Sequence, residues 1–195
     1  ASLLADPHRS AELKLACERL NALADRIEAA EADGDVPADQ VEAINAGLIA
    51  LRDRTWAIAR DRLRAADGVV DLMGPDPSPG ALAAGLSLHQ ALSALDRLEV
   101  RGRDSAGIQL VVTGHDLDLD SAQVRALLAK RRVPLFGSGA VRTPDGSLSF
   151  VYKAAAEIGE LGDNTASSRA AVPADAPLHL ALESPNAWTM ALGHT

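Results

Sequence analysis

Residues 98–108, Leu-Glu-Val-Arg-Gly-Arg-Asp-Ser-Ala-Gly-Ile, decide the fold, because they place a helix end, a tight turn and a strand start close together. Gly102 can adopt backbone angles that are closed to other residues. Asp104 and Ser105 can form the local hydrogen bonds of a chain reversal. Residues 108–112, Ile-Gln-Leu-Val-Val, then predict a β-strand. The segment therefore predicts a helix that returns through a glycine turn into a strand.

This segment resembles the Leu-Glu-Tyr-Arg-Gly-Tyr-Asp-Ser-Ala-Gly-Ile signature of the glucosamine-6-phosphate synthase family, in its glutamine-hydrolysing domain. That domain is a class II glutamine amidotransferase with an N-terminal nucleophile, and the enzymes make glucosamine 6-phosphate from fructose 6-phosphate. A second match lies at residues 191–195, Ala-Leu-Gly-His-Thr, which is similar to the family strand that continues as Gly/Ala-His-Thr-Arg-Trp-Ala. The resemblance covers residues 80–112 and 188–195 well and the segment between them loosely.

Two parts of the family's catalytic machinery have no counterpart in the sequence. In the family, an N-terminal cysteine opens a Cys-Gly-Ile strand, and an arginine after the His-Thr pair grips the α-carboxylate of glutamine. Residues 1–3 are Ala-Ser-Leu, and Cys17 is followed by Glu18 and Arg19 inside a helical pattern. The resemblance therefore implies an internal piece of a longer amidotransferase that contains no complete catalytic set. A degenerate, inactive relative is the alternative.

The matching positions are active-site support in the family. Arg101 and Gly102 match the Arg-Gly pair that lies beside the nucleophile and shapes its pocket. His194 and Thr195 match the strand that delivers the substrate-gripping arginine. Arg103 stands where the family has tyrosine, so the contacts of that aromatic ring are not carried over.

Asp104, Ser105 and Thr195 favour the amino-sugar branch of these enzymes. Related amidotransferases that make phosphoribosylamine carry Arg-Gly-Gln-Glu at the first place and Gly-His-Val-Arg at the second. The resemblance implies glutamine as the substrate of the parent enzyme, a sugar-phosphate-binding domain of the same parent chain that receives the ammonia, a homo-oligomer, and no cofactor.

The composition argues against several classes of protein. A chain of 195 residues with 47% hydrophobic content can bury a sizeable core. A formal net charge of −8 argues against a nucleic-acid partner or an anionic membrane surface, since both require clustered cations. One cysteine excludes an internal disulfide framework, and no long apolar run predicts a membrane span. We expect a cytoplasmic protein.

Two apolar stripes predict an antiparallel helical hairpin over residues 8–67, within an N-terminal region of residues 1–70. Gly34 suits the end of the first helix, and Pro37 suits the first turn of the second. The short form of the family has no such hairpin, so we interpret it as an insertion, with a partner-binding coiled coil as the alternative. The stripes are Leu13, Ala16, Leu20, Leu23, Ile27 and Ala30, and then Val41, Ile44, Leu48, Leu51, Thr55 and Ile58.

Residues 71–80, Asp-Leu-Met-Gly-Pro-Asp-Pro-Ser-Pro-Gly, are rich in proline and glycine and predict a linker. Ser78 and Pro79 suit the cap and first position of a helix that runs into the Arg-Gly turn. For residues 81–195 the resemblance implies an incomplete glutaminase domain. We expect an α+β fold, namely a partial αββα sandwich of the N-terminal-nucleophile hydrolase type with an inserted helical hairpin.

The first half of the glutaminase segment carries two charged features. Asp120 is expected to cap a helix, with Gln123 reaching back to it. The alternating aspartates of residues 116–120 lack the glycine and the glutamate that a calcium loop of this kind requires. Residues 130–132, Lys-Arg-Arg, are expected to complement the dipole at the end of that helix, with phosphate binding as the alternative.

Later segments alternate between strand and helix patterns. Residues 139–142 and 147–152 predict a β-hairpin around a Thr-Pro-Asp-Gly turn. Residues 154–171 predict a helix that Lys153 begins, and residues 188–193 predict a strand. The five histidines never fall at the four-residue helical spacing of a metal pair, so we expect no metal site. The competing function is a helical protein-interaction module that carries a small β-domain.

Overall fold

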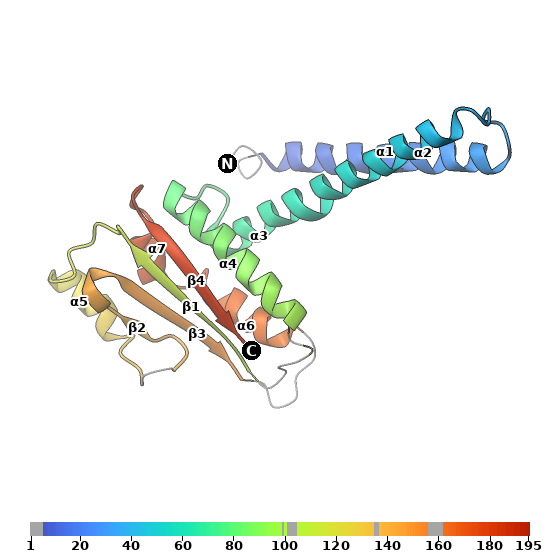
Figure 1. Ribbon diagram of the computed structural model, residues 1–195. Helices are drawn as coiled ribbons and strands as arrows, with labels where there is room; N and C mark the ends of the chain where they lie inside the picture. The colour runs from blue at the N-terminus through green and yellow to red at the C-terminus, as the bar shows by residue number, and fades with distance from the viewer. Residues whose placement is uncertain (1–5, 99, 101–104, 135–136, 156–161) are drawn as a thin grey trace. The chain divides into compact units, whose positions relative to one another are not determined.

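The computed structural model describes residues 6–98, 100, 105–134, 137–155 and 162–195 (Figure 1). The chain divides into two compact units, residues 1–67 and 68–195. The first unit contains helix α1 (Pro7–Ala32), helix α2 (Val41–Trp56) and the π-helix η1 (Ala57–Leu63) that continues it. Helix α3 (Arg64–Met73) starts in the first unit and ends in the second.

Helices α1 and α2 form an antiparallel hairpin. In the residue pairs that contact each other across the hairpin, the residue number falls along α1 as it rises along α2, as expected for antiparallel helices. Among the described residues, four side-chain hydrogen bonds fix the register of the two helices: Asn45 donates to Glu31 at 2.8 Å, Arg52 to Asp25 at 2.8 Å and to Glu28 at 2.6 Å, and Thr55 to Asn21 at 2.7 Å.

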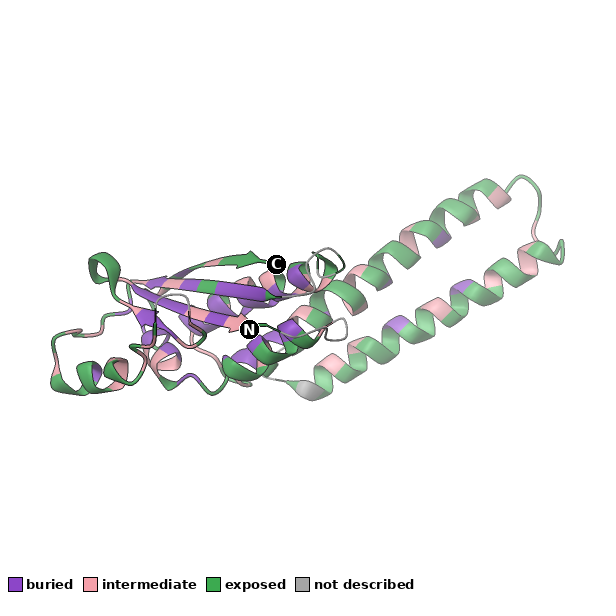
Figure 2. Cartoon of the chain, turned by 90° about the horizontal axis from the view of Figure 1, so that it is seen from below, coloured by how far each residue is buried: buried purple, intermediate pink, exposed green. Residues whose placement is uncertain are grey.

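The buried seam of α1 differs from the predicted stripe. Cys17 and Ala24 are buried, whereas Leu20 and Leu23 are about two-fifths exposed, at 41% and 40%. Leu13 and Ile27 of the predicted stripe are half-buried, so α1 buries a narrower stripe than the pattern predicted. Figure 2 shows that most of the surface of α1 and α2 is exposed, with few buried positions.

The turn between these helices follows the sequence prediction in one respect and corrects it in another. Gly34 has a φ of +79°, in the left-handed region that suits a residue after a helix end. Pro37 does not begin α2, because its carbonyl accepts a hydrogen bond from the Gln40 amide at 2.9 Å in a separate turn. The second helix therefore begins at Val41.

The predicted linker at 71–80 is shortened to residues 74–78. Helix α3 continues to Met73, and Leu72 is 1% exposed within the core of the second unit. Gly74 (φ +87°) ends the helix, with its amide bound to the Val70 carbonyl. Helix α4 (Pro79–Leu98) then begins as expected, since the Ser78 hydroxyl accepts a hydrogen bond from the Ala81 amide at 3.0 Å.

Among its described residues, the second unit is built on one antiparallel sheet of four strands. The strands are β1 (Ala106–Thr113), β2 (Val141–Arg142), β3 (Leu148–Ala154) and β4 (Trp188–His194), in the order β2-β3-β1-β4 (Figure 1). The short helix η2 (Pro144–Gly146) closes the hairpin between β2 and β3. The fold class is therefore α+β, as expected.

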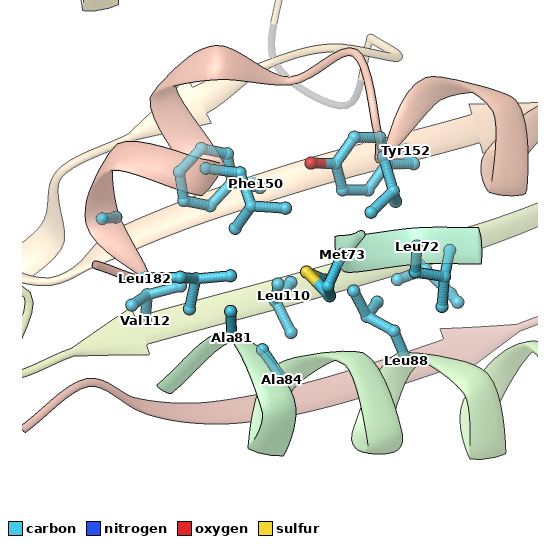
Figure 3. Packing of buried hydrophobic residues seen from close by; sticks show 14 of the residues in the cluster. Leu72, Met73, Ala81, Ala84, Leu88, Leu110, Val112, Phe150, Tyr152 and Leu182 are labelled. Atoms are coloured by element: carbon cyan, nitrogen blue, oxygen red, sulfur yellow. The ribbon is translucent and has the colours of Figure 1, made fainter. Parts of the chain in front are cut away.

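One face of this sheet, the covered face, packs against helices α4, α6 (Asp163–Ala171) and α7 (Ala176–Ala181). Leu110 of β1 pairs with Phe150 of β3, and both side chains are fully buried. Figure 3 shows them in one cluster with Ala84 and Leu88 of α4. Because strand residues alternate between faces, every second residue of β1 and β3 contributes to this core.

The opposite face, the open face, carries the alternate residues of the same strands. Trp188, Met190 and Leu192 of β4 are 61%, 41% and 51% exposed. Val111 of β1 lies opposite Met190, and Gln109 lies opposite Leu192. An exposed row of large apolar side chains on a sheet is uncommon in a face that meets only water.

Two helix starts differ from the sequence prediction. Helix α5 (Ala122–Ala129) is capped by Ser121, whose hydroxyl accepts a hydrogen bond from the Val124 amide at 3.3 Å. Asp120 lies one residue too early to cap it and instead forms an ion pair with Arg125. The helix predicted for 154–171 begins only at Asp163, since residue 154 still belongs to β3 and Gly162, with a φ of +102°, precedes the helix. Residues 156–161 lie outside the described residues.

A buried polar cluster, which we call the Asp175 cluster, fastens α7 to the sheet. The Arg131 guanidinium donates two hydrogen bonds to the Asp175 carboxylate, at 2.6 and 2.7 Å. The Tyr152 hydroxyl donates to the same carboxylate at 2.7 Å. Burial, and then the neighbouring Asp175, raise the pKa of Tyr152 above its ordinary range. The hydrogen bond to Asp175 raises the pKa of Arg131.

Candidate functional site

The two segments that carry the family resemblance lie side by side in the sheet. Strands β1 and β4 pair antiparallel, so that Gly107 lies opposite His194 and Ile108 lies opposite Gly193. These residues are more than eighty positions apart in the sequence. The fold therefore joins the end of the Arg-Gly segment to the Gly-His-Thr segment.

The His194 imidazole lies directly over Gly107. A Cβ atom on residue 107 would lie 2.6 Å from His194 Nε2 and 3.1 Å from its Cε1. Side chains do not approach so closely, so any larger residue at this position would displace the imidazole or the strand. Glycine at position 107 thus allows the exposed His194 imidazole to lie in its present place over the strand.

The neighbouring pair uses the opposite face of the sheet. Gly193 lies opposite Ile108, and a Cβ atom on it would lie 3.2 Å from a methyl carbon of Leu95 on α4. Its missing side chain lets α4 pack closely on the covered face. The Gly-His dipeptide therefore directs one residue toward the helix and the next toward the open face.

An open hollow of about 300 Å³ lies at this end of the open face. It has an apolar wall, formed mainly by Val151 and Leu192, and three polar side chains from three adjacent strands. Its lining residues are Gly107, Ile108, Gln109, Val151, Lys153, Leu192, Gly193 and His194.

Sequence reasoning placed six support residues at this site, and the structure describes three of them. Ser105 is exposed immediately before β1, and Thr195 is exposed immediately after His194. Arg101, Gly102 and Asp104 lie outside the described residues. His194 lies opposite Gly107 at the paired ends of β1 and β4, and Ser105 and Thr195 lie just outside these strand ends.

Of the three polar side chains that line the hollow, two were not predicted as site residues, namely Gln109 and Lys153. Gln109 donates from its side-chain amide to the Ser149 hydroxyl at 2.8 Å, which orients the amide across the sheet. Lys153 was expected to begin a helix, but it lies on β3 opposite Gly107. The alternation of apolar and polar residues over 148–153 was the signal that extends the strand to this lysine.

The hollow offers binding groups without a hydroxyl or thiol nucleophile among its lining residues. An imidazole, an amide and an ammonium beside an apolar wall suit a small polar molecule. Cys17, the single cysteine, is buried on α1. Within the described ranges, no three His, Cys, Asp or Glu side chains are grouped as metal ligands.

None of the helices that the structure describes has the length and apolar character needed to span a membrane. Comparisons of the chain with family models, curated proteins and solved structures found no match.

Proposed function

We propose that this chain is part of a glutamine amidotransferase that releases ammonia from glutamine to make glucosamine 6-phosphate from fructose 6-phosphate. The observation that carries the proposal is the contact between Gly107 and His194. Both residues belong to segments that were singled out from the sequence alone. In the fold these two segments are neighbouring strands, and Gly107 and His194 pack against each other. We place the parent enzyme in the cytoplasm as a homo-oligomer.

The open face of the sheet also supports the proposal. In an αββα sandwich, a second sheet packs on the face that the helices leave free. Trp188, Met190 and Leu192 are the exposed apolar residues that such packing would bury. We propose that the described sheet and the helices α4, α6 and α7 on its covered face are one half of such a sandwich.

In the proposed reaction, a cysteine thiolate of the parent enzyme attacks the side-chain amide of glutamine, and its own α-amino group moves the proton. Hydrogen-bond donors stabilise the tetrahedral oxyanion, ammonia leaves, and water releases glutamate from the thioester. Arg101 and Gly102 support the nucleophile strand, and His194 and Thr195 deliver the segment that holds the substrate carboxylate. Asp104 and Ser105 shape the turn that leads from the Arg101-Gly102 pair into β1.

The test is glutamate release by the natural full-length protein that contains this chain. We expect glutaminase activity, and we expect Arg101→Lys to lower it by an order of magnitude or more, because a planar guanidinium holds two acceptors where an ammonium acts as a point charge. Arg97→Lys on the exposed end of α4 is the matched control and should leave the rate unchanged. An unchanged rate in Arg101→Lys, or no glutamate release by the wild type, would contradict the proposal.

The hairpin unit supports a second role, in protein interaction or assembly. Within the described residues, α1 and α2 expose five large apolar side chains, namely Leu15, Leu20, Leu23, Ile49 and Trp56. We propose that this unit serves assembly and is separate from the chemistry. Deleting residues 8–67 and rejoining the chain at Gly68, which keeps Leu72 and Met73 in their core, should change the oligomeric state seen by light scattering. A folded deletion variant with unchanged assembly and no glutaminase activity would exclude this role.

A further inference from the structure

A second hollow, of about 730 Å³, lies between α5 and the edge strand β2. The hollow beside His194 uses β1, β3 and β4, so the two hollows share no lining residue. This one is lined by Leu119, Asp120, Arg125, Leu128, Arg132, Val141, Arg142 and Thr143. Its volume falls within the range of small-molecule sites.

Three of the lining residues are arginines, in a chain whose formal net charge is −8. Arg125 forms an ion pair with Asp120, the one acidic residue of the lining. The carboxylate of Asp120 does not neutralise the other two guanidiniums of the lining, those of Arg132 and Arg142. The hollow is therefore locally cationic on a protein that is acidic as a whole.

The two remaining arginines are placed differently. The Arg142 guanidinium donates to the Val133 carbonyl at 2.7 Å and to the Val141 carbonyl at 2.9 Å, which fixes its direction without neutralising it. Within the part of the chain that the structure describes, the Arg132 guanidinium has no hydrogen-bond or ion-pair partner. One arginine is thus held in place, and its neighbour is available to a ligand.

The basic run at 130–132 divides into two roles. Arg131 is taken up by the Asp175 cluster and by the Gly139 carbonyl, to which its Nε donates at 2.6 Å. Arg132, the next residue, lines the hollow instead. A structural role for the run, expected from helix-dipole complementarity, therefore accounts for Arg131 but leaves Arg132 unexplained.

We propose that this hollow binds a phosphate ester of a small organic molecule. Guanidinium groups form paired hydrogen bonds with phosphate oxygens, and Arg132 and Arg142 supply two such groups. The Thr143 hydroxyl adds a donor. Leu119, Leu128 and Val141 provide the apolar surface that an organic body contacts and a bare inorganic ion does not. The proposal rests on the lining of this hollow and not on the glutaminase function, and fructose 6-phosphate serves in the test as a phosphate ester whose unphosphorylated form is a ready control.

Isothermal titration calorimetry on this chain with fructose 6-phosphate, a defined phosphate ester, tests the proposal, with fructose as the uncharged partner. We expect the sugar phosphate to bind and fructose not to bind. Arg132→Ala should weaken binding by about tenfold or more, the usual effect of losing a charge-assisted hydrogen bond. Arg97→Ala removes the same charge from an exposed site outside the hollow and should leave binding unchanged.

Several results would overturn the proposal. Absence of binding at millimolar sugar phosphate would do so, and so would equal binding of fructose. Equal weakening by Arg132→Ala and Arg97→Ala would show a general charge effect without a site. Arg132 is exposed and unpartnered in the described structure, so its replacement should not prevent folding, and circular dichroism on the variant verifies this.

Discussion

The two faces of one sheet differ sharply, although the same four strands build both. On the covered face, Leu110 and Phe150 are fully buried beneath helices. On the open face, Leu192 and Trp188 are 51% and 61% exposed, and Gly107 and His194 enclose one end of a hollow. The alternation of strand side chains lets one strand serve both purposes.

This difference separates stability from function within each strand. Buried apolar area and the Asp175 cluster hold the covered face together, so substitutions there should act on the free energy of unfolding. Residues of the open face contribute little to the core, so substitutions there should act on binding or association. The following predictions test that separation, from the largest expected effect to the smallest.

The strongest contrast uses two leucines on neighbouring strands. Leu110→Ala leaves a cavity in the core and should lower the free energy of unfolding by about 3 kcal/mol or more. Leu192→Ala removes a side chain that is 51% exposed and should cost less than about 1 kcal/mol. Urea denaturation of both variants measures the difference. Equal losses would mean that the open face is part of a stabilising core.

A second pair of variants compares carboxylates at two levels of burial. Asp175→Asn leaves the Arg131 charge without its partner and should lower the free energy of unfolding by about 3 kcal/mol. Asp96 contacts Arg169 at 3.5 Å with both side chains about one-third exposed, and an asparagine oxygen can still accept the hydrogen bond that the Thr165 hydroxyl donates to Asp96, so Asp96→Asn should cost less than about 1 kcal/mol. If Asp175→Asn proved as mild as its control, the cluster would have no stabilising role.

The smallest effect concerns the pH dependence of Tyr152, the single tyrosine of the chain. Because its pKa is raised in the folded state, the unfolded state loses the phenolic proton first, and stability falls as pH rises above about 10. Tyr152→Phe should remove this alkaline loss at a cost of about 1 kcal/mol at neutral pH.

Phenolate absorbance in the near ultraviolet reports this residue alone. We expect no phenolate signal from the folded protein until it begins to unfold. A normal tyrosine titration in the folded state would show that the hydroxyl is not enclosed by the Asp175 cluster.

Local patterns in the sequence predicted most of the sheet. The apolar run at 108–112 and the turn signal at 143–146 gave β1 and the β2-β3 hairpin, because strand alternation and turn chemistry are properties of neighbouring residues. Helix capping was less accurate, since Asp120 and Ser121 are both good caps and only the helix start at Ala122 separates them.

Contacts between distant residues were not predictable. Arg131 and Asp175 are separated by 44 positions, and no local pattern connects them. The hollow between α5 and β2 likewise depends on the fold, and for the cations at 130–132 the sequence predicted a helix-dipole role, with phosphate binding only as the alternative. The contact of Gly107 with His194 was not predicted, because the family resemblance assigned both segments to the active-site region without pairing these two residues.

The most direct test of the account compares one residue from each face in the natural full-length protein. Gly107→Ala on the open face should reduce glutamate release per folded molecule by tenfold or more, because its Cβ displaces the His194 imidazole. Leu110→Ala on the covered face should lower stability while each folded molecule keeps most of its activity. The account is contradicted if Gly107→Ala retains full turnover, or if Leu110→Ala alone abolishes turnover in molecules that remain folded.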